Sequence, residues 1–149
     1  MELSLPSLTI ITIVYNRVKD IEYTLKSITE QTYKNIEYIV IDGNSNDGTL
    51  DIIQKYLDKI NHLVSEKDNG IYDAMNKGLR LATGDYVLFI NGGDNLHQKN
   101  TIENIFQIFD NKNQGTPDLI FGECMLVDNH RNYIQTRSAY KKQEFPKSL

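Results

Sequence analysis

The chain contains short apolar runs that are continuous rather than alternating. The clearest is Leu8–Val14, whose sequence LTIITIV is rich in the β-branched residues that favour strands. A continuous apolar run bounded by polar residues is typical of a strand that helices cover on both faces. The pattern predicts strands at 8–14, 36–42, 62–66 and 86–90.

Between these runs, apolar residues recur at intervals of three and four, which is the period of an amphipathic helix. Asn16 is expected to cap the first helix, which should run to about Gln31. Gly84 is expected to end the third helix as a C-terminal stop. The apolar faces of the four predicted helices are Val18, Ile21, Leu25 and Ile28; Leu50, Ile53, Leu57 and Ile60; Ile71, Ala74, Met75, Leu79 and Ala82; and Ile102, Ile105, Phe106 and Phe109.

The last part of the chain has a different pattern. Residues 118–128 and 132–138 are two strand-like segments separated by a short polar turn, which predicts a closing hairpin. The alternation of strands and helices before it indicates an α/β fold with a doubly wound, mostly parallel sheet and right-handed crossovers. The 149 residues suffice for one hydrophobic core, so we expect a single domain over 1–149.

Composition narrows the possible functions. The net charge is -4 and the 16 Lys and Arg residues are scattered, so we expect no nucleic-acid partner. The single cysteine, Cys124, excludes an intramolecular disulfide and a cysteine-based zinc cluster, and we expect it to be a small core residue. No apolar run reaches the roughly 18 residues that span a bilayer, and the first residues do not resemble a signal peptide. We therefore expect a cytoplasmic protein without an integral membrane segment.

A polar segment follows each of the four predicted strands, at 15–16, 42–45, 66–70 and 91–94. The carboxyl ends of parallel strands meet at one edge of a sheet, which is where ligands bind in open α/β folds. Asp42 and Asp94 each end a strongly apolar run, which favours a ligand site over simple turns. Turn formation alone is an alternative for each segment, since Asn, Asp and Gly dominate turns for conformational reasons.

Three segments together resemble family 2 glycosyltransferases, the inverting enzymes with the GT-A (Rossmann-like) fold. They are TIITIVYNR, IEYIVIDGNSNDGT and SEKDNGIYDAMNKGLRLATGDYVLFINGGD, and the resemblance is close from Leu8 to Leu96. It implies a nucleotide-sugar-binding domain that uses a nucleoside-diphosphate sugar, with a UDP-sugar as the expected donor, and a divalent cation, Mn²⁺ or Mg²⁺. The implied acceptor is a saccharide or lipid-linked saccharide in bacterial surface-polysaccharide biosynthesis, at the inner face of the cell membrane.

The resemblance also implies roles for individual residues. Asp42 would hydrogen-bond the base or ribose of the donor, and Tyr15 and Asn16 would lie along the nucleoside. Asp68 matches a loop acid near the ribose and diphosphate, and the next helix would bring Asn76 toward the donor. From the residues alone, Asp42 could instead cap the following turn, Tyr15 could cover the edge of the core, and Asn76 could be an exposed helix residue.

Asp94 matches the final acid of the family's metal-binding motif and would hold the cation against the diphosphate. Asn91 and Gly93 stand where the family often has further acids, so Asp94 would be the one protein carboxylate, completed by substrate phosphates. Asn91, Gly92 and Gly93 would bind the nucleotide sugar, because glycine lets the backbone approach a ligand closely. The alternative is a tight turn in which Asp94 caps the next helix. Lys77 is expected to be solvated.

The residues after Leu96 match no acceptor site. Inverting transfer needs a general base near the acceptor hydroxyl, and the resemblance implies that this base and the acceptor-binding part lie beyond the end of the chain. A non-catalytic module that binds nucleotide-diphosphate sugars is therefore the alternative function. A receiver-like domain is disfavoured because Tyr15 and Asn16 replace its acidic pair, and a dinucleotide-binding domain because the Gly-x-Gly-x-x-Gly fingerprint does not follow the first strand.

Overall fold

The computed structural model describes residues 5–110 and 117–138, apart from the side chains of 108–110. The chain divides into two compact units, Met1–Lys112 and Asn113–Leu149. The first unit carries a parallel sheet with its helices, and the second carries a hairpin. The expectation of one domain over 1–149 stays a prediction.

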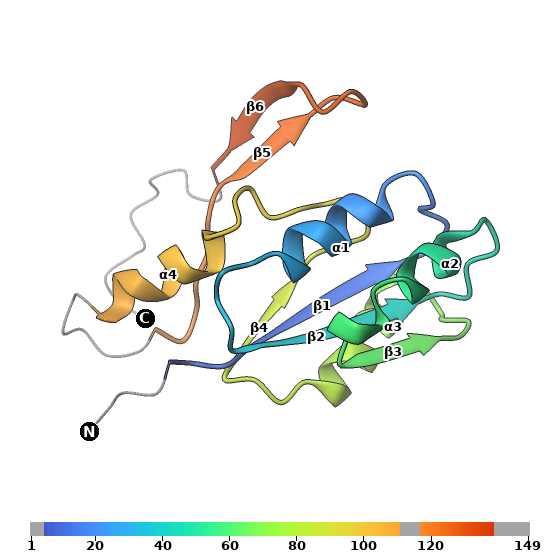
Figure 1. The fold of residues 1–149 in the computed structure, drawn as a ribbon, viewed down its shortest axis with the longest axis horizontal. Helices are drawn as coiled ribbons and strands as arrows, with labels where there is room; N and C mark the ends of the chain where they lie inside the picture. The colour runs from blue at the N-terminus through green and yellow to red at the C-terminus, as the bar shows by residue number, and fades with distance from the viewer. Residues whose placement is uncertain (1–4, 111–116, 139–149) are drawn as a thin grey trace, which may run out of the picture. The chain divides into compact units, whose positions relative to one another are not determined.

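The first unit is built on a four-stranded sheet in which every pair of neighbouring strands is parallel (Figure 1). The strand order is β3-β2-β1-β4, so the first strand of the sequence lies inside the sheet. The strands are β1 (Leu8–Val14), β2 (Ile36–Asp42), β3 (His62–Ser65) and β4 (Tyr86–Phe89). All four predicted strands are confirmed.

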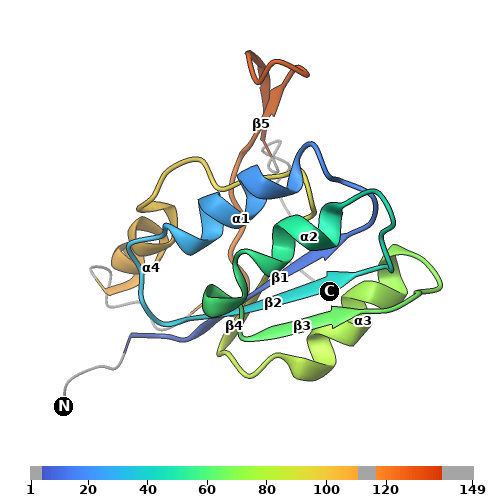
Figure 2. The ribbon, with the colours of Figure 1, turned by 45° about the vertical axis from the view of Figure 1, so that its right-hand side comes forward.

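Helices cover both faces of this sheet. Figure 2 shows α1 (Ile21–Thr29) and α2 (Thr49–Gln54) on one face and α3 (Ile71–Leu81) on the other. All seven residues of β1 are buried, which explains why its sequence is apolar without alternation. On the α3 side, Ile11 and Ile13 pack in one buried cluster with residues of β2 and α3. The doubly wound α/β class is therefore confirmed.

The first helix begins later than predicted. Asn16 has a left-handed φ of 49° and does not cap a helix, because its side chain holds a neighbouring loop instead. The chain makes a turn in which the Arg17 carbonyl accepts a hydrogen bond from the Ile21 amide at 2.9 Å, and α1 begins there. The helix also ends before Gln31. The predicted Asn16 cap is thus wrong.

The second and third helices end before their apolar patterns do. α2 stops at Gln54 and a separate 3-10 turn follows at Leu57–Lys59, while α4 spans Thr101–Asp110. Gly84 does not have the left-handed backbone conformation that glycine adopts when it ends a helix. A Cβ at this position would lie 2.7 Å from the Thr9 amide nitrogen, so glycine is needed there for close packing against β1. Over residues 5–110 and 117–138, the helices are too short and too polar to cross a bilayer.

The second unit contains the predicted hairpin, β5 (Cys124–Val127) antiparallel to β6 (Tyr133–Arg137). The register shifts between Leu126 and Val127, which marks an irregularity in the ladder. Cys124 is exposed, so its expected core position is wrong. The reason is that the described part of this unit forms only a two-stranded ribbon, without a second layer to bury the thiol.

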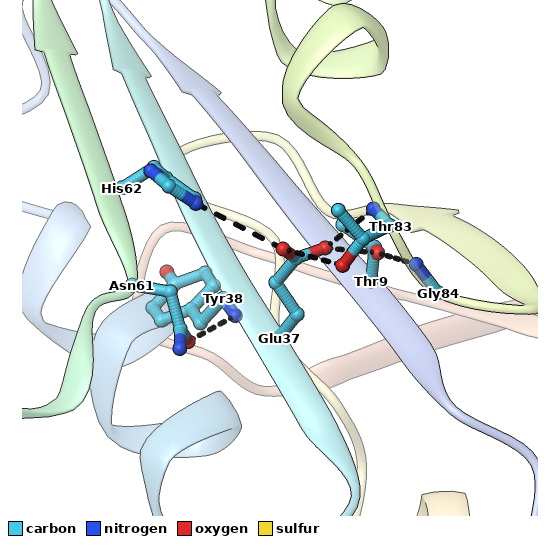
Figure 3. Close-up of polar contacts among 7 residues, drawn as sticks. All are labelled: Thr9, Glu37, Tyr38, Asn61, His62, Thr83 and Gly84. Atoms are coloured by element: carbon cyan, nitrogen blue, oxygen red, sulfur yellow. Dashed lines mark hydrogen bonds and ion pairs between the residues drawn. The ribbon is translucent and has the colours of Figure 1, made fainter.

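A carboxylate joins three segments at the amino end of the sheet (Figure 3). Glu37 of β2 accepts hydrogen bonds from the Thr9 hydroxyl at 2.5 Å and from the amide and hydroxyl of Thr83, at 2.8 and 2.9 Å. His62 Nε2 lies 3.9 Å from the same carboxylate. Burial raises the pKa of Glu37, but the hydrogen bonds from Thr9 and Thr83 outweigh it and hold the pKa below its ordinary value. The cluster therefore ties the turn after α3 to the sheet.

Glu37→Gln should destabilise the fold by about 1–3 kcal/mol at neutral pH, because an amide cannot accept all these hydrogen bonds and leaves a donor unpaired. Because the folded-state pKa is lowered, this carboxylate stabilises the fold above pH 4.5, and its contribution is lost as the pH falls through the folded-state value. Urea unfolding at a series of pH values should show a difference between wild type and variant that shrinks in acid. Asp58→Asn, on an exposed residue of the 3-10 turn Leu57–Lys59, is the control. A difference that does not change with pH would contradict this role.

Candidate functional site

A cleft of about 480 Å³ lies at the carboxyl ends of the strands in the first unit. This volume is in the range of sites for small molecules and cofactors. The segments that follow β1, β3 and β4 contribute to its wall, as the parallel topology requires. The lining residues are Ile13, Val14, Tyr15, Arg17, Asp68, Gly70, Ile71, Ala74, Asn91, Gly92 and Asp94. Of the predicted site residues, Tyr15, Asp68, Asn91, Gly92 and Asp94 line the cleft, and Asn16, Asp42, Asn76 and Gly93 do not.

Asn16 joins the loop after β1 to the loop after β2. The backbone amide of Asn16 donates to Ser45 Oγ at 2.9 Å. Its side-chain oxygen accepts from the backbone amide of Asn46 at 3.0 Å. The left-handed backbone of Asn16 brings both groups to the same neighbouring loop. In this structure Asn16 therefore supports the wall of the cleft, and its predicted contact with a nucleoside stays a prediction.

Asp42 lies at the end of β2 with an exposed fraction of 0%. Its carboxylate accepts hydrogen bonds from the amide of Ser45 at 3.1 Å, from the Ser45 hydroxyl, and from the Ser65 hydroxyl at 2.6 Å. These bonds satisfy a buried charge, and they also fix the loops after β2 and β3 to each other. Asp42 therefore caps the turn that follows β2 in this structure, and its predicted contact with the nucleoside stays a prediction. A contact with a ligand would require one of the serine bonds to be exchanged.

A second set of contacts at this edge, around Asp47, was not predicted from the sequence. Asp47 accepts from the Thr49 hydroxyl at 2.6 Å and from the Val18 amide at 3.1 Å, and the hydroxyl bond lowers the pKa of Asp47. The Thr49 hydroxyl in turn accepts from the Arg17 amide at 2.7 Å. Arg17, which is one of the residues that line the cleft, is therefore fixed at its backbone. The available signal for Arg17 was a basic residue in the short polar loop after the first strand.

Tyr15 and Asp68 meet above Gly43. A Cβ at residue 43 would lie 2.7 Å from Asp68 Oδ2 and 3.4 Å from Tyr15 Cδ2, so a larger residue there would displace the Asp68 carboxylate. Tyr15 is 59% exposed and lines the cleft, which is not the position of a residue that covers the edge of the core. The other oxygen of Asp68 accepts from the Gly70 amide at 2.9 Å, which folds the loop back on itself.

Lys77 on α3 holds the loop that presents Asp68. The expectation of a solvated side chain is wrong, because only 14% of it is exposed and its ammonium group lies 2.9 Å from Glu66 and 3.6 Å from Asp73. The hydrogen bond to Glu66 raises the pKa of Lys77. Lys77 also donates to a loop carbonyl at 3.0 Å, and the Asp73 carboxylate accepts from the Asn69 amide at 3.0 Å. The neighbouring Asn76 is exposed on α3.

The turn after β4 is fixed by contacts to β1 and α1. The Gly92 amide donates to the carbonyl of Ile13 at 2.8 Å, and a Cβ at residue 92 would lie 2.7 Å from a methyl group of Val14. Gly93 has a φ of 110°, which favours glycine. The Thr24 hydroxyl of α1 accepts from the Gly93 amide at 2.9 Å and donates to the carbonyl of residue 94 at 2.7 Å. The turn is therefore rigid at both ends.

Two oxygen-bearing side chains of this turn lack internal partners. Asn91 Oδ1 is buried without a hydrogen-bond partner, and the exposed Asp94 carboxylate has no partner among the described residues. Asp94 does not cap the next helix, which begins only at Thr101. No group of three or more His, Cys, Asp or Glu side chains in the described part of the chain is arranged to hold a metal ion. The turn thus has two oxygen groups without described internal partners: the Asp94 carboxylate is exposed to a ligand, and Asn91 Oδ1 is buried next to the cleft.

A sequence model described as Glycosyl transferase family 2 matches residues 9–148. The chain belongs to glycosyl transferase family 2. This family 2 chain is 31% identical over 124 residues to the PGL/p-HBAD biosynthesis glycosyltransferase of Mycobacterium tuberculosis (strain ATCC 25177 / H37Ra), covering 81% of the chain and 48% of the relative. It is 32% identical over 104 residues to glycosyltransferase AglE of Haloferax volcanii, covering 66% and 34%. The chain spans about half, or less, of the length of these curated relatives.

Solved structures extend the comparison to the fold. The family 2 chain matches residues 1–349 of TarS from S. aureus in complex with UDP, with a TM-score of 0.64 and 28% identity over 75% of this chain and 38% of that one. It matches the mannosyltransferase PcManGT from Pyrobaculum calidifontis in complex with GDP-Man and Mn²⁺, with a TM-score of 0.63 and 30% identity over 68% and 32%. Both are GT-A glycosyltransferases, so the predicted GT-A-like fold is confirmed.

Lys77→Met should loosen the loop between β3 and α3 of this family 2 chain, because it removes the ammonium group that holds Glu66, Asp73 and a loop carbonyl together. Hydrogen exchange of the Asn69 and Gly70 amides should accelerate by about tenfold or more, while the β1 amides stay protected. Lys77→Arg should restore part of the protection, and Lys26→Met, on an exposed ion pair, should have no effect there. Unchanged exchange in Lys77→Met would show that the loop is held by other contacts.

Proposed function

We propose that this chain binds a nucleoside-diphosphate sugar in the cleft, with a UDP-sugar as the expected donor. The sugar is transferred with inversion to a saccharide or lipid-linked saccharide acceptor. The observation that carries the proposal is the pair of oxygen groups, Asn91 Oδ1 and the Asp94 carboxylate, that the turn after β4 leaves without partners beside the cleft. Family membership supplies the reaction class.

The oxygen groups of the turn after β4 suit a divalent cation. Mn²⁺ and Mg²⁺ prefer oxygen ligands, and Mg²⁺ in particular is bound through one or two protein carboxylates together with substrate phosphates. Asp94 offers an unpaired carboxylate, and the buried Asn91 Oδ1 offers a neutral oxygen without another partner. Asp94 would hold the cation, with Asn91 as a further ligand or as a hydrogen-bond acceptor for the sugar. When bound, the cation supplies charge stabilisation for the leaving nucleoside diphosphate.

The other predicted site residues would either contact the nucleoside or support the loops around it. Tyr15 and Asp68 lie together above Gly43, where an aromatic face and a carboxylate suit a base and a ribose. Asp42 and Asn16 fix the loops after β1, β2 and β3 to one another, and in this proposal they support the nucleoside site. The glycines of the turn after β4 let the backbone approach the sugar and phosphates.

The neighbours support the choice of donor. TarS has been solved with UDP and with UDP-GlcNAc, and PcManGT with GDP-Man and Mn²⁺. We extend this to a role in polysaccharide biosynthesis in the cytoplasm, at the inner face of the membrane. The same proposal includes a general base that deprotonates the acceptor hydroxyl and a site that binds the acceptor.

Calorimetric titration of the chain with UDP, GDP, ADP and CDP, each with and without Mn²⁺, tests the donor site. We expect one nucleotide to bind in a metal-dependent way and to stabilise the fold by about 2.7 kcal/mol at a hundred times its dissociation constant. Absence of binding by every nucleotide, in the presence of the metal, would refute the proposal.

Asp94→Asn should remove the metal-dependent part of nucleotide binding, because an amide keeps the shape of the side chain but loses the charge that attracts the cation. The melting temperature without ligand should stay nearly the same, since the Asp94 carboxylate has no described internal partner and the turn is held through backbone groups. Asp58→Asn, on an exposed residue away from the cleft, is the matched control. Metal-dependent binding that survives in Asp94→Asn would exclude Asp94 as the metal ligand.

Gly43→Ala should weaken nucleotide binding with or without metal. The added methyl group would lie 2.7 Å from Asp68 Oδ2, and the flexible end of that side chain can move away without unfolding the loop. The expected result is a loss of affinity with little change in thermal stability. Gly122→Ala, where a methyl group meets open space, is the control. Unaltered affinity in Gly43→Ala would separate Asp68 and Tyr15 from the binding site.

A further inference from the structure

The residues that line the cleft carry more negative than positive charge. Asp68 and Asp94 bring two carboxylates to its wall, and Arg17 is the one cationic residue among the described residues that line it. A nucleoside diphosphate carries several negative charges, so the carboxylates alone would repel it unless a cation intervenes. The only positive charge that the described cleft itself supplies is the guanidinium of Arg17.

This guanidinium is free to take a ligand. No described residue forms a hydrogen bond or an ion pair with the Arg17 side chain, which is exposed. Lys77 is the contrasting case, because Glu66 and Asp73 already neutralise its charge. A positive group that lines a cleft without an internal partner gains more from a bound anion than one that must first leave an ion pair.

The backbone of Arg17 is fixed by contacts that do not involve its side chain. Its amide donates to the Thr49 hydroxyl at 2.7 Å, and its carbonyl accepts from the amides of Asp20 and Ile21 at 3.0 and 2.9 Å. Substitution of the side chain leaves these bonds in place. The base of the side chain is therefore held at the cleft, which reduces the entropy that the residue loses when it binds an anion.

We propose that Arg17 binds a phosphate group of the donor's nucleoside diphosphate and provides the metal-independent part of diphosphate recognition. The inference rests on the proposed donor site and assigns to it a residue that acts beside the cation. A guanidinium is suited to this role because its planar set of N–H donors matches two phosphate oxygens at once. Arg17 and the Asp94-bound cation would then share the charge of the diphosphate.

The test compares the affinities of UDP and of uridine in wild type, Arg17→Ala, Arg17→Lys and Lys19→Ala, each with and without Mn²⁺. Arg17→Ala should lower the affinity for UDP by about tenfold to a hundredfold, which is the effect of losing a charged hydrogen-bonding group. It should leave the affinity for uridine unchanged, because uridine has no phosphate. Arg17→Lys should recover part of the loss, since it keeps the charge but not the fork of donors. Lys19→Ala removes a nearby exposed charge that does not line the cleft and should match wild type.

The outcomes separate this inference from the proposed function. Equal affinity for UDP in wild type and Arg17→Ala would overturn the role of Arg17 while leaving the donor site intact. A parallel loss of uridine binding would also overturn it, because Arg17 would then act on the nucleoside or on the loop. If GDP is the nucleotide that wild type binds, GDP and guanosine replace UDP and uridine. Wild type that binds neither diphosphate overturns the donor site, and the role of Arg17 with it.

Discussion

Every residue of β1 is buried, and the strand pairs in parallel with β2 on one side and β4 on the other. This arrangement fixes the geometry of the whole first unit. Because the strands point the same way, the segments after β1, β2, β3 and β4 must emerge at one edge, and the helices must return across the faces of the sheet. The cleft lies at that edge because the topology leaves no other place for the polar segments to meet.

Close approaches at two glycines shape the walls of the cleft. Gly92 brings the turn after β4 against Val14, and Gly43 leaves room for Asp68 and Tyr15. At the amino end of the sheet, Gly84 allows the turn after α3 to pack on Thr9, beside the Glu37 carboxylate. The positions of the ligand-facing side chains thus depend on backbone contacts as much as on the side chains themselves.

Polar groups at the carboxyl edge fall into two sets. The first set, Asp42, Asp47 and Lys77, forms hydrogen bonds and ion pairs that hold the loops at this edge. Arg17 and Asp94 keep their charges unpaired within the described structure. The first set makes the edge rigid, and the second set is available for a ligand.

The sequence by itself determined the strands, the α/β class and the edge at which the polar segments gather, because burial on both faces leaves a continuous apolar run that is read locally. It picked out Asp42 and Asp94 alike, since each charge ends such a run, and it could not tell the buried Asp42 from the exposed Asp94. Only the tertiary structure decided which polar residues face the cleft. Asn16 bonds to Asn46, Asp42 to Ser65, and Glu66 to Lys77, and these partners come from different loops or elements. Local periodicity carries no information about such pairs, which depend on how the sheet brings distant loops together.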